Sequence, residues 1–146
     1  MTSGSVRLLA PSGWSVEVPD GFQQKDNGDS WQAYNSDGSR VVYIASLDIS
    51  GPQGQPSADQ IVERAMTDAE GVIHFRSEDV VGRARVSSQE HTWVVTGVSA
   101  IAGRVATTTI SVTVEADVPW AVEAWRSIRF DGQKASGKRR WLGRRK

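Results

Sequence analysis

Residues 92–116 read TWVVTGVSAIAGRVATTTISVTVEA and predict two paired β-strands. In Arg104–Ala116, mainly small or aliphatic residues alternate with mainly threonine and other polar residues, which is the period-two pattern of a half-buried strand. The run Thr92–Ile101 is a second strand, and Ala102-Gly103 between them fits a tight hairpin turn. Because β-branched polar residues suit an exposed pleated surface, we expect the threonine face to be solvated.

Further strand patterns lie on both sides of this hairpin. Trp14–Val18 alternates between apolar and polar residues and is followed by the turn residues Pro19-Asp20-Gly21. Asp37-Gly38 separates two more runs and favours a hairpin, because both residues tolerate positive φ. The remaining strand-like runs are residues 30–35, 40–49, 72–77 and 80–86.

Two segments have the spacing of amphipathic helices. Ser57 and Gln60 form a capping box at the start of the first, and Gly71 marks its expected end. The second follows Asp117, with Pro119 in its first turn, where proline is tolerated. The apolar stripes are Ile61, Val62, Ala65, Met66 and Ala69 in the first helix, and Val118, Ala121, Val122, Trp125 and Ile128 in the second.

The order of these elements indicates the fold class. Strands are followed by a helix, then by several strands and a final helix, and hairpin turns dominate over helical crossovers. We therefore expect an α+β fold with a mainly antiparallel central sheet and helices packed on its faces. Trp14, Trp93 and Trp125 fall on apolar stripes and are expected in the core, whereas the pattern around Trp31 leaves its position open.

Charge divides the chain into two parts. Residues 1–133 carry ten lysines and arginines against all seventeen acidic residues, which gives −7. Residues 134–146 carry seven basic residues and no acid, which gives +7, and the stretch from Asp131 to Lys138 is typical of a linker. We expect one domain over residues 1–131 and a flexible basic C-terminal tail over residues 132–146.

Two segments resemble the PsbP-like superfamily. Gly13-Trp-Ser-Val-Glu-Val-Pro-Asp-Gly-Phe22 is similar to the family's opening strand, and Ala121-Val-Glu-Ala-Trp-Arg-Ser-Ile-Arg-Phe130 is similar to its closing helix and final strand. The resemblance covers roughly residues 6–130 by pattern and element order. It implies a PsbP-like sandwich like that of the photosystem II P subunit and the yeast Ran-binding Mog proteins. Members act mostly as protein-binding or assembly subunits and share no catalytic residue, so none is transferred to this chain.

Motifs for catalysis or cofactor binding are weak. There is no cysteine, and His74 and His91 are too few for an all-histidine metal site. Residues 132–139 approach a phosphate-binding loop, but Arg139 stands where serine or threonine is needed. Ser99 lies in a predicted strand without the closing glycine of a nucleophile elbow, and His74 is expected at the surface. We predict no catalytic, cofactor-binding or metal-binding residue, no cofactor and no enzymatic activity.

Partner-binding residues are predicted at two places. Trp120 lies nearly opposite the Trp125 stripe of the last helix, so we expect it to be exposed or partly exposed and a candidate interface anchor. In the tail, Trp141 stands among charges that suit an anionic membrane surface, nucleic acid or an acidic protein patch. These tail residues are Lys138, Arg139, Arg140, Arg144, Arg145 and Lys146.

The sequence leaves three functional hypotheses. The preferred one is a non-enzymatic protein-binding or assembly module, with the tail contacting anionic surfaces. The second is a nucleic-acid-associated accessory protein that binds through the tail, and the third is an enzyme with a dispersed active site. Because the sequence shows no membrane-spanning run and no signal-peptide pattern, we expect a cytoplasmic protein.

Overall fold

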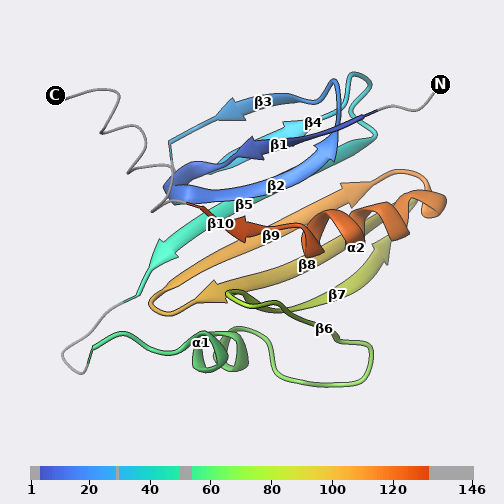
Figure 1. Cartoon of the computed structure of the whole chain (residues 1–146). Helices are drawn as coiled ribbons and strands as arrows, with labels where there is room; N and C mark the ends of the chain where they lie inside the picture. Colours follow the sequence, from blue (N-terminus) through green and yellow to red (C-terminus); the bar gives the residue numbers. More distant parts are fainter. Residues whose placement is uncertain (1–3, 29, 50–53, 132–146) are drawn as a thin grey trace, which may run out of the picture.

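The structure is a computed structural model that describes residues 4–28, 30–49 and 54–131 (Figure 1). In these residues two antiparallel sheets and two α-helices form an α+β sandwich, as the sequence predicts. The larger sheet has seven strands in the order β3-β4-β5-β9-β8-β7-β6, and the smaller has three in the order β1-β2-β10. The seven strands in chain order are β3 (Gln23–Asp26), β4 (Trp31–Tyr34), β5 (Arg40–Asp48), β6 (Ile73–Arg76), β7 (Val81–Gln89), β8 (Thr92–Ile101) and β9 (Arg104–Val112). The other elements are β1 (Ser5–Leu9), β2 (Trp14–Pro19), β10 (Arg129–Phe130), α1 (Ala58–Ala65) and α2 (Val118–Arg126).

The hairpin over residues 92–116 lies at the centre of the larger sheet. Ile101 pairs with Arg104 across Ala102-Gly103, and Gly103 takes the positive φ that the turn requires. The Asp37-Gly38 turn likewise joins β4 to β5. Both hairpins confirm the sequence prediction.

The two faces of the larger sheet have different covers. Adjacent residues of a strand point to opposite faces of the sheet. Val105 therefore packs in one hydrophobic cluster with the buried residues of α1, whereas Ala106 packs in another with the buried residues of α2. We call the two sides the α1 face and the α2 face. The α2 face is also covered by the smaller sheet, which contributes Trp14 and Val16 to the core. Figure 1 shows α2 over β8 and β9, and α1 away from it near the β6–β7 hairpin.

Trp125 is the central core residue of the α2 face. Its side chain is 1% exposed and lies against Gly97 and Gly82, where an added Cβ atom would come within 2.4 Å and 2.9 Å of the indole ring. These two glycines therefore make the space that the indole fills. Trp14 and Trp31 are also buried, whereas Trp93 is only partly buried.

Two local predictions were wrong in their bounds. Helix α1 ends at Ala65 rather than near Gly71, because Met66 takes an extended conformation and Asp68 then bonds His74. Strand β9 ends at Val112, and residues 115–117 form a 3₁₀ turn that leads into α2. Glu90 and His91 both have positive φ and form the turn between β7 and β8. The capping box of Ser57 and Gln60 is confirmed, with both of its hydrogen bonds present.

Candidate binding groove

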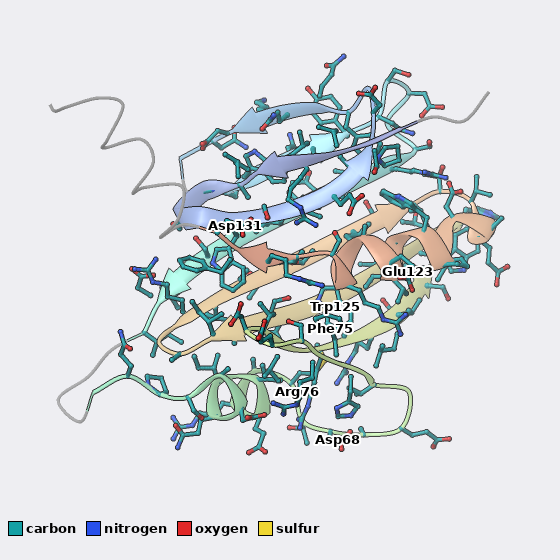
Figure 2. The ribbon with its side chains drawn as sticks, in the orientation of Figure 1. Asp68, Phe75, Arg76, Glu123, Trp125 and Asp131 are labelled. Atoms are coloured by element: carbon teal, nitrogen blue, oxygen red, sulfur yellow. The ribbon has the colours of Figure 1, made fainter. Side chains whose placement is uncertain are left out.

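A groove of about 760 Å³ lies between the β1–β2 pair and helix α2. Residues of five strands (β1, β2, β5, β6 and β10) and of helix α2 line it, together with Ser127, and Figure 2 labels Phe75 and Glu123 among them. Its charged and aromatic residues are Arg7, Glu17, Arg40, Phe75, Trp120, Glu123, Arg126 and Arg129. No stretch of the sequence holds these side chains together, so only the fold assembles the groove.

Hydrogen bonds fasten the two walls of the groove to each other. Arg7 on β1 donates from one Nη atom to the carbonyl of Ser127 at 2.9 Å and to the hydroxyl of Ser15 at 3.0 Å. The Ser127 hydroxyl accepts from the main-chain N–H of Glu17 at 2.9 Å and donates to the Ala124 carbonyl at 2.6 Å. The C-terminal turn of α2 is therefore held on the smaller sheet by cationic and hydroxyl groups, which satisfy its last carbonyls.

The lining of the groove carries more cations than anions. Four arginines face two glutamates there, although residues 1–133 as a whole carry a charge of −7. Arg126 bonds Glu123 at 2.5 Å, and Arg7 lies 3.5 Å from Glu17. Arg129 forms no ion pair with any described residue: its guanidinium donates to the carbonyls of Arg126 and Ile128 and lies 5.0 Å from the ring centroid of Phe75. Arg40 is paired with Asp117, so among the described residues Arg129 is the cation of this groove that is left for a partner with negative charge.

Trp120 lies in the wall of the groove and is partly buried, within the range that its place on the helix predicts. The Arg40 guanidinium lies 4.5 Å from the Trp120 ring centroid, and Phe22 packs against the same side chain with a centroid distance of 5.9 Å. Arg40 also bonds Asp117 at 2.8 Å, and this hydrogen bond holds the pKa of Asp117 below its ordinary value. Trp120 is thus a preorganised wall residue with part of its surface open to the groove.

Ser15 joins the start of β2 to the end of the described chain. Its alternation with Trp14 predicts a solvated position, but Ser15 is completely buried. Its hydroxyl donates to a carboxylate oxygen of Asp131 at 2.8 Å, and the main-chain N–H of Asp131 donates to the Gly13 carbonyl at 2.6 Å. The sequence contains no signal for this contact, because the two residues are far apart in the chain. Trp141 and the basic residues of the tail lie outside the described residues.

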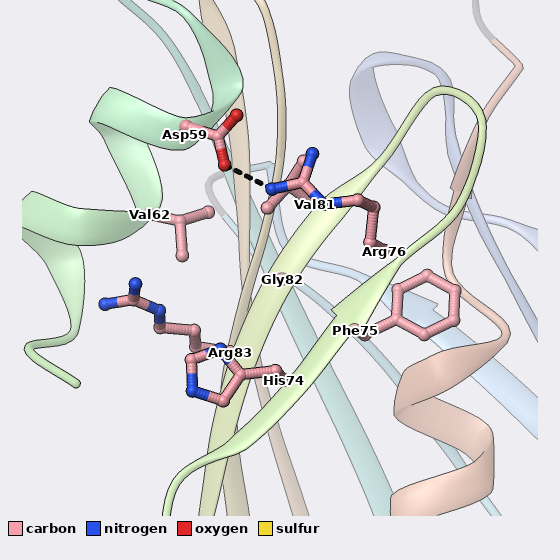
Figure 3. Close-up of a pocket in the computed structure, with 8 residues that line it drawn as sticks. All are labelled: Asp59, Val62, His74, Phe75, Arg76, Val81, Gly82 and Arg83. Carbon is pink, nitrogen blue, oxygen red and sulfur yellow. Dashed lines mark hydrogen bonds and ion pairs between the residues drawn. The ribbon is translucent and has the colours of Figure 1, made fainter. Parts of the chain in front are cut away.

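A smaller pocket of about 240 Å³ lies between α1 and β6 (Figure 3). Arg76 on β6 bonds Asp59 on α1 at 2.6 Å, and Arg83 donates to the Met66 carbonyl at 2.8 Å. His74 is exposed, as predicted, and lies 2.9 Å from Asp68, which lowers the pKa of that carboxyl. Phe75 also lines this pocket, so one residue of β6 borders both cavities.

Three further features of the described residues concern a catalytic serine, metal binding and membrane crossing. Ser99 lies inside β8 and is buried, which confirms its interpretation as a strand residue. Among the described residues, no three His, Asp or Glu side chains come together in a way that could hold a metal ion. No helix in this part of the chain is long and apolar enough to cross a membrane.

Comparison with solved structures identifies the fold. A protein of Bacteroides thetaiotaomicron VPI-5482 aligns with a TM-score of 0.62 at 11% identity over 88% of this chain and 49% of that one, so this chain spans about half of its length. The solution structure of cyanobacterial PsbP (CyanoP) from Synechocystis sp. PCC 6803 aligns with a TM-score of 0.56 at 11% identity, over 89% of this chain and 94% of that one. No family model and no curated protein matches the sequence. The shared architecture confirms the expected fold.

Proposed function

We propose that this PsbP-like domain is a non-enzymatic protein-binding or assembly module that holds its partner in the groove between the β1–β2 pair and α2. The observation that carries the proposal is the convergence of four arginines and two aromatic rings on one open cavity of about 760 Å³. Arginine and aromatic side chains are the types that protein interfaces favour. The PsbP-like fold also supports it, because the resemblance noted in the sequence implies binding and assembly subunits.

The test compares partner capture by three forms of the full chain after chemical cross-linking in extract of the native source. Arg126→Glu reverses a half-exposed charge in the groove, and Arg85→Glu is the matched control, because Arg85 is exposed on β7 and does not line the groove. We expect the wild type and Arg85→Glu to recover the same partner, and Arg126→Glu to recover about tenfold less, since it repels an anionic contact. Equal recovery by all three forms contradicts a partner in the groove.

The basic tail supports a second, separable contact with anionic surfaces. Seven basic residues and Trp141 within residues 134–146 suit either a negatively charged membrane or nucleic acid. Binding of the full chain and of residues 1–133 to anionic vesicles and to DNA, measured over a salt series, distinguishes the two. Tail-dependent, salt-sensitive binding to DNA but not to vesicles favours the nucleic-acid-associated alternative, and binding that survives truncation contradicts a role for the tail. The cytoplasmic location expected from the sequence stays a prediction.

A further inference from the structure

Strand β6 is an edge of the larger sheet, and its pairing with β7 shows which of its main-chain groups point outward. The two-residue turn at Glu90-His91 makes Gln89 and Thr92 a hydrogen-bonded pair, and such pairs alternate along an antiparallel ladder. Along β7 this alternation directs the N–H and C=O groups of Val81 and Arg83 toward β8. Those of Gly82 and Ala84 are then directed toward β6, where their partners are Phe75 and Ile73.

The N–H and C=O groups of His74 and Arg76 consequently point away from the sheet. Neither residue forms a backbone hydrogen bond across this edge to another part of the described chain. A row of such groups is a template for a further strand. The opposite edge, β3, is different: its four residues, Gln23–Asp26, are polar and exposed, and such edges resist pairing.

The two cavities lie on either side of this edge. Phe75 borders both of them, with the large groove on the α2 face and the smaller pocket on the α1 face (Figures 2 and 3). Side chains of an added strand would alternate between the two faces, as they do in any strand. Every second side chain would therefore lie near the groove, and those between them would lie near the pocket.

The chemistry of the two sides differs. On the α2 face the cation Arg129 lies over Phe75 and forms no ion pair with a described carboxylate. On the α1 face the pocket lining combines the aliphatic Val62 and Val81 with polar side chains, and two of these are already paired, Arg76 with Asp59 and His74 with Asp68. A strand with acidic side chains toward the α2 face and aliphatic side chains toward the α1 face places its carboxylates near Arg129 and leaves the ion pairs of the pocket intact.

We propose that β6 binds an extended acidic segment of a partner protein as an additional strand, with acidic side chains toward Arg129 and aliphatic side chains toward the pocket beside α1. The inference rests on the proposed function for its partner and names the chemistry of that partner. Phe75 is also one of the residues that line the groove, so a segment paired with β6 lies beside the groove that Trp120 borders. Main-chain pairing supplies affinity in such complexes, and alternate side-chain contacts supply specificity.

The first test uses the synthetic peptide acetyl-Val-Glu-Val-Glu-Val-Glu-Val-amide as the probe and the full chain labelled with ¹⁵N. We expect hydrogen exchange at the His74 and Arg76 amides to slow by about tenfold in the complex, while the Gly82 amide, already paired with β6, changes little. The peptide in which lysine replaces glutamate should bind about tenfold more weakly. Unchanged exchange at both edge amides, or equal binding of the two peptides, overturns the proposal.

The second test separates main-chain pairing from side-chain contact. Two further peptides carry N-methyl groups on alternate residues, one on the glutamates and one on the valines, and only one of these sets can face β6. We expect one pattern to weaken binding by about tenfold and the other to leave it unchanged. Equal effects of the two patterns overturn strand addition.

A charge reversal then tests the role of Arg129. We expect Arg129→Glu to reverse the preference, so that the lysine peptide binds better than the glutamate peptide, a result that a folding defect does not produce. An unchanged preference overturns the assignment of Arg129. If the edge peptides fail while Arg126→Glu still loses the native partner, the groove stands and only the strand addition is wrong. If the peptides bind to β6 and Arg126→Glu recovers as much native partner as the wild type, strand addition at β6 is supported and the groove as the partner site is contradicted.

Discussion

The two faces of the larger sheet are made by the same strands, yet they are covered to very different depths. On the α2 face, Trp31 of the larger sheet, Trp14 of the smaller sheet and Trp125 of α2 are almost fully buried in one core. On the α1 face, one short helix covers a small cluster, and Thr107 and Thr109 of the central strand remain exposed. The difference shows that the elements packed on a face of the sheet, rather than the strands themselves, determine which side chains are tolerated there.

Neighbouring residues of β8 show the contrast most clearly. Gly97 points to the α2 face and lies under Trp125, where a Cβ atom has no room. Thr96, one residue earlier, points to the opposite face and is exposed. The two cavities follow the same division, because the large groove forms where the smaller sheet and a helix meet on the α2 face, whereas the smaller pocket beside β6 lies on the α1 face.

The largest effect is expected from removing the central indole of the α2 face. Trp125→Ala should lower the free energy of unfolding by about 3–5 kcal/mol, because it leaves a large cavity beneath α2. Met66→Ala on the α1 face should lower the free energy of unfolding by about 2 kcal/mol. This is the lower end of the range for buried methionines replaced by alanine, because Met66 lies at the margin of its hydrophobic cluster. Urea unfolding followed by circular dichroism measures both. Equal losses would contradict a deeper core on the α2 face.

A smaller effect is expected from adding one methyl group to that face. Gly97→Ala should cost about 1–3 kcal/mol, because the new Cβ atom would lie 2.4 Å from Trp125 Nε1. Thr96→Ala is the matched control and should change stability by less than about 0.5 kcal/mol, because its side chain is exposed. In a Trp125→Phe background the cost of Gly97→Ala should fall, which a double-mutant cycle would detect. Additive costs would show that the glycine serves another purpose.

The smallest effect concerns how the stability of each face depends on pH in the acid range. Hydrogen bonding to Arg40 lowers the pKa of Asp117, so this pair stabilises the fold above the ordinary aspartate pKa of about 3.9 and loses that contribution as the pH falls through the folded pKa. Asp117→Asn should lower stability at pH 7 by at most about 1 kcal/mol, and the difference should vanish in acid. Asp68→Asn should have a weaker effect, because the Asp68–His74 pair is more exposed. Urea midpoints measured from pH 7 downward test this order, and a constant difference at every pH would refute it.

Local chemistry was sufficient to predict most of the elements. The alternation of Arg104–Val112, the glycine turns and the capping box of Ser57 each depend on residues close together in the chain. The same reasoning predicted that Trp120 is at least partly exposed and that Ser99 lies inside a strand. It failed at the end of α1. The apolar stripe continues past Ala65, but Met66 is extended and the segment after it is held by the contact between Asp68 and His74.

Long-range packing established the rest. The burial of Ser15 depends on Arg7 and Asp131, and the cationic groove depends on arginines that come from both ends of the chain. No periodicity records such contacts, because hydrophobic patterning reports which face of an element is covered but not which element covers it. The strand positions and turns therefore follow from nearest-neighbour preferences, whereas the groove and the free edge of β6 exist only because distant elements pack together.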